Sequence, residues 1–244
     1  MIYNSSHGDR MPKQPEKSKI ENHKRVNDIL LAVIEKPAIN FLVRVLPSWI
    51  TPDMLTIFGF LSSILIGVSY YLSNFNRNYL WLASLGFILN WFGDSLDGNL
   101  ARYRNIERPL YGFFIDHAID IMSEVLIFLG LASSSFVDFK IGALALIAYL
   151  CMTNLVFLIT SVEGVFQISY GGLGPTEARV IAIIANTIVF FTGNPIVHLP
   201  IGTINIFDLV VVIVIVLLAV IFVTTTISHA ITLSRKDQAA HIHK

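Results

Sequence analysis

Six long apolar segments constrain the fold of this chain more than any other feature of its sequence. They occupy residues 54–72, 79–96, 110–132, 141–162, 178–192 and 207–227. A helix that crosses a bilayer needs about 20 mainly apolar residues, so each segment matches one crossing, and 178–192 is the shortest. Only 14% of the residues are charged, whereas a soluble domain carries about a quarter. The sequence therefore predicts an all-α integral membrane protein with six transmembrane helices.

Cations are distributed unequally between the two sides that six crossings would create. One side carries the N-terminal arm, the 102–108 connection, Arg179 and the Arg235–Lys236 tail. The other side carries only Arg77, Lys140 and His198. By the positive-inside rule, both termini and the 102–108 connection are expected to face the cytoplasm.

The segments outside the apolar runs complete the predicted organisation. Residues 1–25 are polar and rich in lysine, which predicts a flexible basic cytoplasmic arm near anionic lipid headgroups. Residues 26–47 mix apolar and charged positions around Pro37, a pattern typical of an amphipathic helix that lies along the membrane surface. A six-helix membrane domain over 48–235 follows, and residues 236–244 form a cytoplasmic tail.

Four carboxylates lie where the second and third apolar segments meet, although an unpaired charge at membrane depth costs at least about 2.5 kcal/mol. Asp94 and Asp97 share one helix face, and Asp116 and Asp120 share another. A short connection makes the two helices antiparallel neighbours, so we expect the four carboxylates to converge. This all-oxygen ligand set predicts Mg²⁺ or a similar hard ion such as Mn²⁺, and two ions rather than one.

Small residues and an arginine follow the first carboxylate pair. Gly98 and Ala101 remove side-chain bulk, so a flat ring or a phosphate chain could approach the backbone there. Arg102 is suited to pairing with phosphate oxygens. Together these features indicate a site for a nucleoside diphosphate. The alternatives are acidic residues that only cap and solubilise helix ends, a cation transporter that uses the cluster as an ion site, and a non-enzymatic scaffold.

Two other carboxylates near the cluster have structural interpretations. Asp53, which follows the Thr51-Pro52 turn, is placed to cap the first crossing helix. Glu124 lies four residues beyond Asp120 on the same face, where it would bond within the bundle or border an acceptor pocket.

The pattern Asp-x-x-Asp-Gly-x-x-Ala-Arg, followed after a gap by Gly-x-x-x-Asp-x-x-x-Asp, resembles the signature of the CDP-alcohol phosphotransferases. These are membrane enzymes of phospholipid synthesis. The eight matching positions are Asp94, Asp97, Gly98, Ala101, Arg102, Gly112, Asp116 and Asp120. The gap is longer than usual in the family and places Arg108 and Pro109 where a small hydroxyl residue often helps to bind phosphate. The resemblance extends over residues 45–185 and includes Thr51–Thr56, which is similar to the family's start of the first crossing.

This resemblance implies an enzyme that transfers a substituted phosphate from a CDP-alcohol to an acceptor hydroxyl and releases CMP. It implies metal ligands at Asp94, Asp97, Asp116 and Asp120, of which Asp120 is also the general base. It implies contacts to the nucleotide or its phosphates from Thr56, Gly98, Ala101, Arg102 and Gly112. The family also implies a homodimer. Because the formal net charge is zero, no nucleic-acid partner is expected, and the partners are the donor, the acceptor and membrane lipids.

Features outside the signature leave the substrates open. His117 and the Gly174–Glu177 turn are similar to elements of the choline and ethanolamine phosphotransferase branch, which uses CDP-choline or CDP-ethanolamine with diacylglycerol. A chain with six crossings instead resembles the compact enzymes of prokaryotic inner or plasma membranes. Many of those enzymes use CDP-diacylglycerol with a polar alcohol. His117 could assist proton removal or have a structural role. Glu177 could cap a helix, pair with an arginine or help to bind the acceptor.

Overall fold

The computed structural model describes residues 24–26, 31–163, 165–167, 174–199 and 202–242. Its seven helices are α1 (Ala32–Val45), α2 (Pro52–Leu72), α3 (Tyr79–Tyr103), α4 (Pro109–Ala132), α5 (Phe139–Glu163), α6 (Pro175–Thr192) and α7 (Ile206–Ile242). Its short strands are β1 (Lys24–Val26), β2 (Val165–Gln167), β3 (Ile196–Leu199) and β4 (Gly202–Asn205). β1 pairs with β2 in parallel, and β3 pairs with β4 in antiparallel. The arm expected over residues 1–25 lies outside the described residues, apart from β1.

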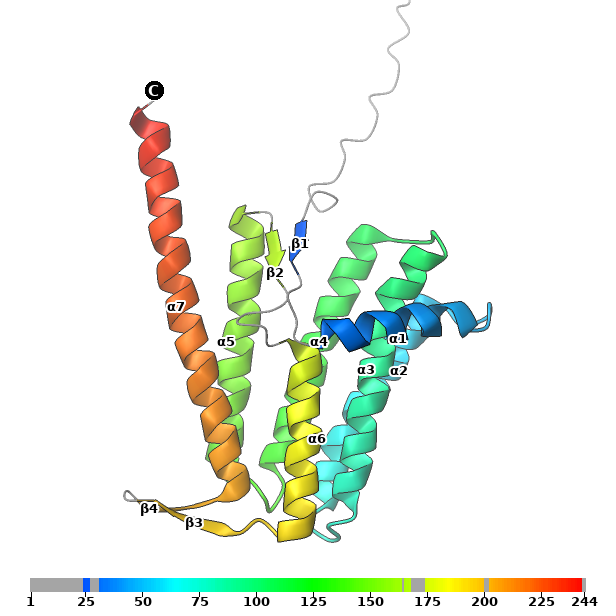
Figure 1. Cartoon of the computed structure of the whole chain (residues 1–244), viewed down its shortest axis with the longest axis vertical. Helices are drawn as coiled ribbons and strands as arrows, with labels where there is room; N and C mark the ends of the chain where they lie inside the picture. Colours follow the sequence, from blue (N-terminus) through cyan, green and yellow to red (C-terminus); the bar gives the residue numbers. More distant parts are fainter. Residues whose placement is uncertain (1–23, 27–30, 164, 168–173, 200–201, 243–244) are drawn as a thin grey trace, which may run out of the picture.

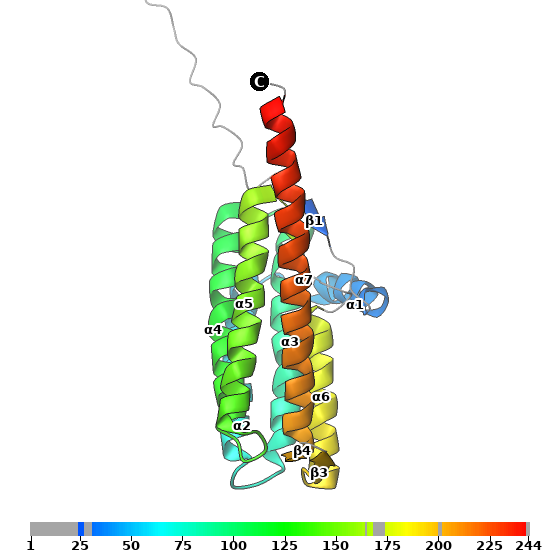
Figure 2. The same ribbon diagram turned by 90° about the vertical axis from the view of Figure 1, so that its left-hand side faces the viewer.

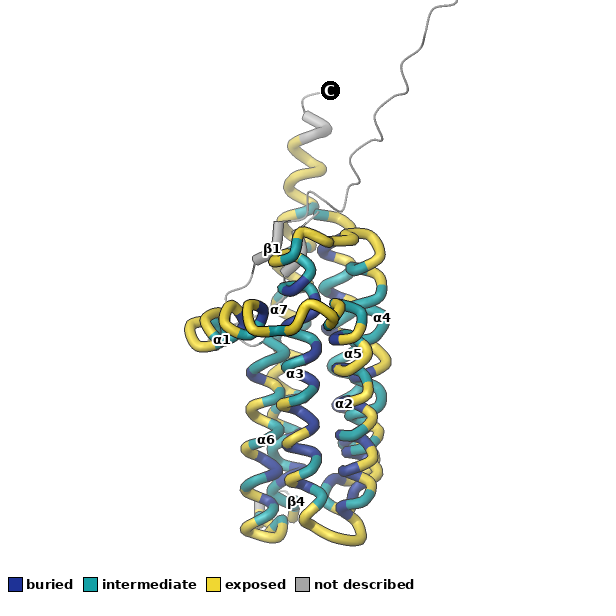
Figure 3. Tube along the Cα trace, turned by 90° about the vertical axis from the view of Figure 1, so that its right-hand side faces the viewer, coloured by how far each residue is buried: buried dark blue, intermediate teal, exposed yellow. Residues whose placement is uncertain are grey.

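The six long helices α2 to α7 run side by side, and α1 lies across them (Figures 1 and 2). β1, the α3–α4 connection and the C-terminal end of α7 lie at one end of the bundle, and the β3–β4 hairpin lies at the other. Helices α2, α5 and α6, and α7 as far as Ala239, are long and apolar enough to cross a membrane. Buried residues line the inside of the bundle, while exposed residues dominate its outer faces (Figure 3). The chain is an all-α integral membrane protein.

Helix α2 packs against both α3 and α4 through close glycine contacts. A Cβ atom on Gly93 would lie 2.6 Å from the nitrogen of Gly59 and 2.6 Å from the oxygen of Leu55. Gly67 and Gly130 make a similar approach between α2 and α4. Among the described residues, α3 and α4 make at most marginal contact with each other. The expectation that α3 and α4 are direct neighbours is therefore wrong, because the glycines bring α2 against both.

The remaining contacts close the six long helices into a ring. Helix α3 packs on α6, α4 packs on α5, and α7 contacts both α5 and α6. Three buried polar side chains inside the ring are linked by hydrogen bonds: the hydroxyl of Tyr70 donates to Asn186 at 3.0 Å, and the amide of Asn186 donates to Ser84 at 3.2 Å. A buried polar group without a partner is costly, so these bonds favour one packing of α2, α3 and α6.

The loop between α1 and α2 is fixed by an arginine at the end of α3. Arg104 donates hydrogen bonds to four backbone oxygens of this loop, those of Leu46, Pro47, Ser48 and Ile50. The loop then leads into α2, whose N-terminus is capped by Thr51: its Oγ1 accepts a 3.2 Å hydrogen bond from the nitrogen of Met54. The prediction that Asp53 is this cap is wrong. Asp53 lies one residue inside the helix and pairs with Arg108, and this bond raises the pKa of the Arg108 guanidinium.

Candidate metal centre

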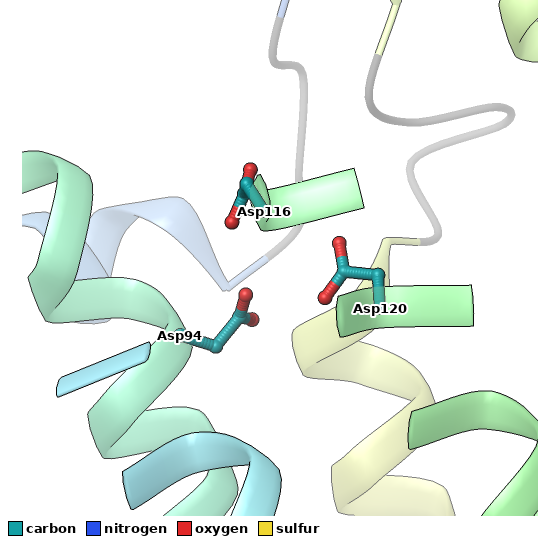
Figure 4. A group of neighbouring side chains, drawn as sticks. All are labelled: Asp94, Asp116 and Asp120. Carbon is teal, nitrogen blue, oxygen red and sulfur yellow. The ribbon is translucent and has the colours of Figure 1, made fainter. Parts of the chain in front are cut away.

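Three carboxylates from two helices project toward one another (Figure 4). Asp94 comes from α3, and Asp116 and Asp120 come from successive turns of one face of α4. Each offers an oxygen atom, and these atoms all lie within 4.8 Å of one another. Like charges at this separation repel, and a hard divalent cation that prefers oxygen ligands would neutralise them. The donor set therefore fits a divalent metal ion.

The position of Asp94 depends on the residue before it. Gly93 forms the close contact with Gly59 of α2, so α3 approaches α2 most closely one residue before the carboxylate. The same α2 packs on α4 through Gly67 and Gly130. Helix α2 thus sets the distance between α3 and α4 although it contributes none of the three carboxylates.

An arginine of α6 lies against this group of carboxylates. Nη2 of Arg179 lies 2.6 Å from Oδ2 of Asp94, and both side chains are largely buried. Nε of Arg179 donates a 2.8 Å hydrogen bond to Asn90. The amide nitrogen of Asn90 in turn donates to the oxygen of Gly59 and to the hydroxyl of Ser63, both at 3.0 Å. The guanidinium is therefore held in place by both of its neighbours.

Arg179 was not predicted as a site residue, because the sequence indicates a cytoplasmic cation or an ion partner of Glu177 at this position. The sequence nevertheless contains a feature from which this role could have been predicted. An arginine in the first turns of an apolar helix needs a partner at membrane depth, and the carboxylate cluster is the natural one.

Asp97 lies outside the group of three. It is buried, with only 8% of its surface exposed, and its Oδ2 accepts a 2.6 Å hydrogen bond from the hydroxyl of Thr56. The structure thus divides the four signature carboxylates into three that converge and one that is bonded to α2. The ligand role of Asp97 and the nucleotide contact of Thr56 stay predictions.

The remaining signature residues lie on either side of the α3–α4 connection. Gly98, Ala101 and Arg102 occupy the last turns of α3, and Nη2 of Arg102 donates a 3.1 Å hydrogen bond to Asn99. A Cβ atom on Gly98 would lie 3.5 Å from the Arg102 guanidinium, an ordinary contact distance. Gly112 lies in the first turn of α4, and no described atom lies within 4 Å of a Cβ placed there. Packing alone does not require glycine at either position.

His117 projects toward α5 and is held by aromatic neighbours. Its Nδ1 lies 2.6 Å from the backbone oxygen of Phe113. The imidazole ring lies 4.2 Å from the ring of Phe113 and 5.2 Å from that of Phe157, measured between centroids. Its Nδ1 is also 3.9 Å from Oδ2 of Asp116. His117 therefore borders the carboxylates, and these contacts fix the orientation of its ring.

Glu177 caps α6. Its Oε2 accepts a 3.0 Å hydrogen bond from the nitrogen of Gly174, and its Oε1 accepts a 2.9 Å bond from the nitrogen of Leu31. The side chain therefore satisfies a backbone donor of its own turn and one just before α1. Glu124 bonds within the bundle, where it accepts a 3.4 Å hydrogen bond from Thr153 of α5.

Comparison with known proteins agrees with the resemblance in the sequence. The family model for CDP-alcohol phosphatidyltransferase matches residues 49–234. Archaetidylinositol phosphate synthase of Pyrococcus horikoshii is 37% identical over 98 residues, which cover 40% of this chain and 49% of that protein. Cholinephosphotransferase 1 of Danio rerio is 27% identical over 63% of this chain and 42% of its own length. The matched segments therefore span about half of the length of these relatives.

A solved structure shares the fold. The crystal structure of Mycobacterium tuberculosis phosphatidylinositol phosphate synthase with CDP-DAG bound superimposes with a TM-score of 0.51. The match covers 81% of this chain and 92% of that chain, at 21% sequence identity. At this identity the likeness concerns the arrangement of the helices.

Proposed function

Because this chain belongs to the CDP-alcohol phosphatidyltransferase family, we propose that it transfers a substituted phosphate from a CDP-alcohol to an acceptor hydroxyl and releases CMP. The reaction is a step of phospholipid biosynthesis. The observation that carries the proposal is the convergence of Asp94, Asp116 and Asp120, whose ligand atoms lie within 4.8 Å of one another. Phosphoryl transfer from a diphosphate needs such a site, because the charge must be neutralised before an oxygen atom can attack.

The carboxylates would hold Mg²⁺, with Mn²⁺ as a substitute. Asp94, Asp116 and Asp120 supply ligands, and Asp97 adds a fourth carboxylate for a second ion. Each oxygen of Asp97 has more than one lone pair, so its bond with Thr56 is compatible with this role. When bound, the metal neutralises the diphosphate and the leaving group.

The other side chains bind the donor and move one proton. Arg102 pairs with phosphate oxygens, and Thr56, Gly98, Ala101 and Gly112 border the nucleotide. Asp120 accepts the proton of the acceptor hydroxyl as general base. The acceptor oxygen then forms a bond to the phosphorus distal to cytidine, while the bond from that phosphorus to the CMP oxygen breaks. CMP leaves with the electron pair of that bond.

The donor that we favour is CDP-diacylglycerol, with a polar alcohol such as an inositol phosphate as the acceptor. The similarity to archaetidylinositol phosphate synthase supports the inositol phosphate acceptor, and the solved structure that shares the fold and holds CDP-DAG supports the donor. A second candidate is CDP-choline or CDP-ethanolamine with diacylglycerol. His117, the Gly174–Glu177 turn and the similarity to a cholinephosphotransferase favour this second pair.

The membrane arrangement follows from the same proposal. All six long helices cross the membrane of a prokaryotic cell, both termini and the metal centre face the cytoplasm, and the protein is a homodimer. Helices α3 and α4, with 25 and 24 residues, are long enough to cross, and the charges they carry, except Glu124, lie in the halves nearer the α3–α4 connection. In a Cys151→Ser background, cysteines at Glu107 and Lys140 should react with an impermeant reagent from opposite sides of the membrane.

The activity is tested with purified protein in detergent and Mg²⁺. Labelled CDP-diacylglycerol, CDP-choline and CDP-ethanolamine are each combined with a panel of acceptors that includes inositol phosphate, other polar alcohols and diacylglycerol, and CMP is measured. We expect CMP from one donor and acceptor pair, and none with EDTA or with Asp116→Asn. Absence of CMP from every pair would contradict the proposal, and cation flux through liposomes would then favour a transporter.

A further inference from the structure

Glu35 of α1 binds two other helices at once. Its Oε1 accepts a 2.9 Å hydrogen bond from Nε1 of Trp91 and a 3.3 Å bond from the hydroxyl of Ser95, both in α3. The same oxygen accepts a 2.9 Å bond from the hydroxyl of Thr176 in α6. Hydrogen bonds to an ionised carboxylate are about twice as strong as those between neutral groups. Glu35 therefore joins α3 to α6 from a third helix.

The partners of Glu35 adjoin the metal centre. Ser95 directly follows Asp94, and Thr176 lies one turn before Arg179, which pairs with Asp94. Further contacts join α3 to α6 along the rest of their interface, namely those of Asn90 with Arg179 and of Ser84 with Asn186. Glu35 adds the last polar contact of this row, beside the carboxylates.

Helix α1 presents two different surfaces. Ile39 and Val43 are buried against residues of α2 and α3. Val33, Ile34 and Phe41 are 82%, 72% and 64% exposed, as expected for a helix whose outer face meets lipid. Glu35 is only partly exposed, and its carboxylate bonds inward to α3 and α6. The amphipathic helix is thus attached to the site by a polar contact as well as by its apolar side chains.

We propose that Glu35 is a positioning residue of the metal centre. It holds α3 and α6 at the separation at which Asp94 and Arg179 face Asp116 and Asp120. The effect on catalysis rests on the proposed function, whereas the effect on metal binding does not. Groups hydrogen-bonded directly to metal ligands typically change metal affinity or activity about 10- to 100-fold when they are replaced; Glu35 acts through Ser95 and Thr176, so we expect an effect at the lower end of this range.

The experiment compares Glu35→Ala and Glu35→Gln with the control Lys36→Ala, which alters an exposed neighbour on the same helix. The affinity for Mn²⁺ is measured from the EPR signal of free Mn²⁺, and kcat and KM are measured with the CDP-alcohol donor. Emission of Trp91 is recorded in a Trp49→Phe, Trp81→Phe background. We expect Glu35→Ala to weaken Mn²⁺ binding about 10-fold, to lower kcat more than it raises KM, and to shift Trp91 emission. Glu35→Gln keeps an acceptor oxygen and should recover most of the affinity, and Lys36→Ala should match the wild type.

Each outcome decides the proposal. If Glu35→Ala is folded and binds Mn²⁺ within about twofold of the wild type, a margin much smaller than the expected loss, Glu35 does not position the site. If the variant only unfolds at a lower temperature while its folded fraction keeps wild-type Mn²⁺ affinity, the proposal is also overturned. If the wild type releases no CMP but Glu35→Ala still weakens Mn²⁺ binding, the proposed function fails and the positioning role stands.

Discussion

The hydroxyl of Thr56 in α2 donates a 2.6 Å hydrogen bond to Oδ2 of Asp97 in α3. Asp97 is buried, and a buried acceptor that loses its partner costs about 1–3 kcal/mol. Thr56→Val should therefore lower the free energy of unfolding by about that amount and reduce CMP release. Thermal denaturation in detergent measures the first effect. Thr56→Ser retains the hydroxyl and is the control; equal stability of the Val and Ser variants would count against the role of this bond.

Loss of the Arg179 charge should make the stability of the protein depend on metal. Arg179 pairs with Asp94, and breaking a buried ion pair from one side typically costs about 3–5 kcal/mol. A divalent cation can replace the missing positive charge. Arg179→Met should therefore lower the Tm strongly in EDTA and much less in Mg²⁺. Arg77→Met is the control, because Arg77 lies in the α2–α3 connection at the other end of the bundle. Its Tm should differ between EDTA and Mg²⁺ by the same amount as that of the wild type.

Asp120→Asn should abolish turnover while the donor still binds. The amide keeps the size of the side chain but cannot accept the proton of the acceptor hydroxyl, and general base catalysis contributes about 10²- to 10⁴-fold. Calorimetric titration with a CDP-alcohol measures binding, and CMP release measures turnover. Glu124→Gln alters a carboxylate one turn deeper on the same face and should lose much less activity. Near wild-type turnover in Asp120→Asn would exclude it as the base.

Gly93→Ala should separate α2 from α3 and displace Asp94. The added Cβ atom would lie 2.6 Å from backbone atoms of Gly59 and Leu55, neither of which can move without its helix. Overpacking of this kind typically costs about 1–3 kcal/mol. We expect a lower Tm together with weaker Mn²⁺ binding. Gly112→Ala is the matched control for stability, since no described atom lies within 4 Å of its added Cβ, and a similar fall in Tm in both variants would contradict the packing argument.

The helices themselves could be predicted from the sequence because their apolar runs are long. The predicted crossing over 79–96 is extended in α3 to Tyr103, and that over 207–227 is extended in α7 to Ile242. Both extensions are polar, so hydropathy stops before the hydrogen-bonded helix does. The amphipathic pattern predicted a helix over 26–47; the helix found there, α1, is shorter, begins at Ala32 and continues through Pro37.

Which helices contact each other could not be predicted from the sequence. A short connection favours direct packing of α3 on α4, but the glycines at positions 59, 67, 93 and 130 bring both against α2. Helix contacts of this kind depend on where small residues coincide in space, which a single sequence does not show.

The spacing of the signature predicted that four carboxylates converge, since spacing along a helix fixes which residues share a face, and three of the four do so. It did not predict that Asp97 is bonded to Thr56, that Arg179 pairs with Asp94, or that Glu35 bonds to residues next to the site. Arg179 and Glu35 come from helices far away in the sequence, and the amphipathic pattern of α1 does not show that one of its charged residues points inward.

The pairing of Asp94 with Arg179 also has a consequence for how the chain enters the membrane. Asp94 belongs to α3, whereas Arg179 belongs to α6, which follows both α3 and α4 in the chain and is therefore synthesised after them. If all six long helices cross the membrane as proposed, the acidic helices α3 and α4 are inserted before their arginine exists. We expect them to remain close to the translocation machinery until α6 arrives, so truncation of the chain before residue 175 should leave a poorly inserted fragment even though every signature residue is present.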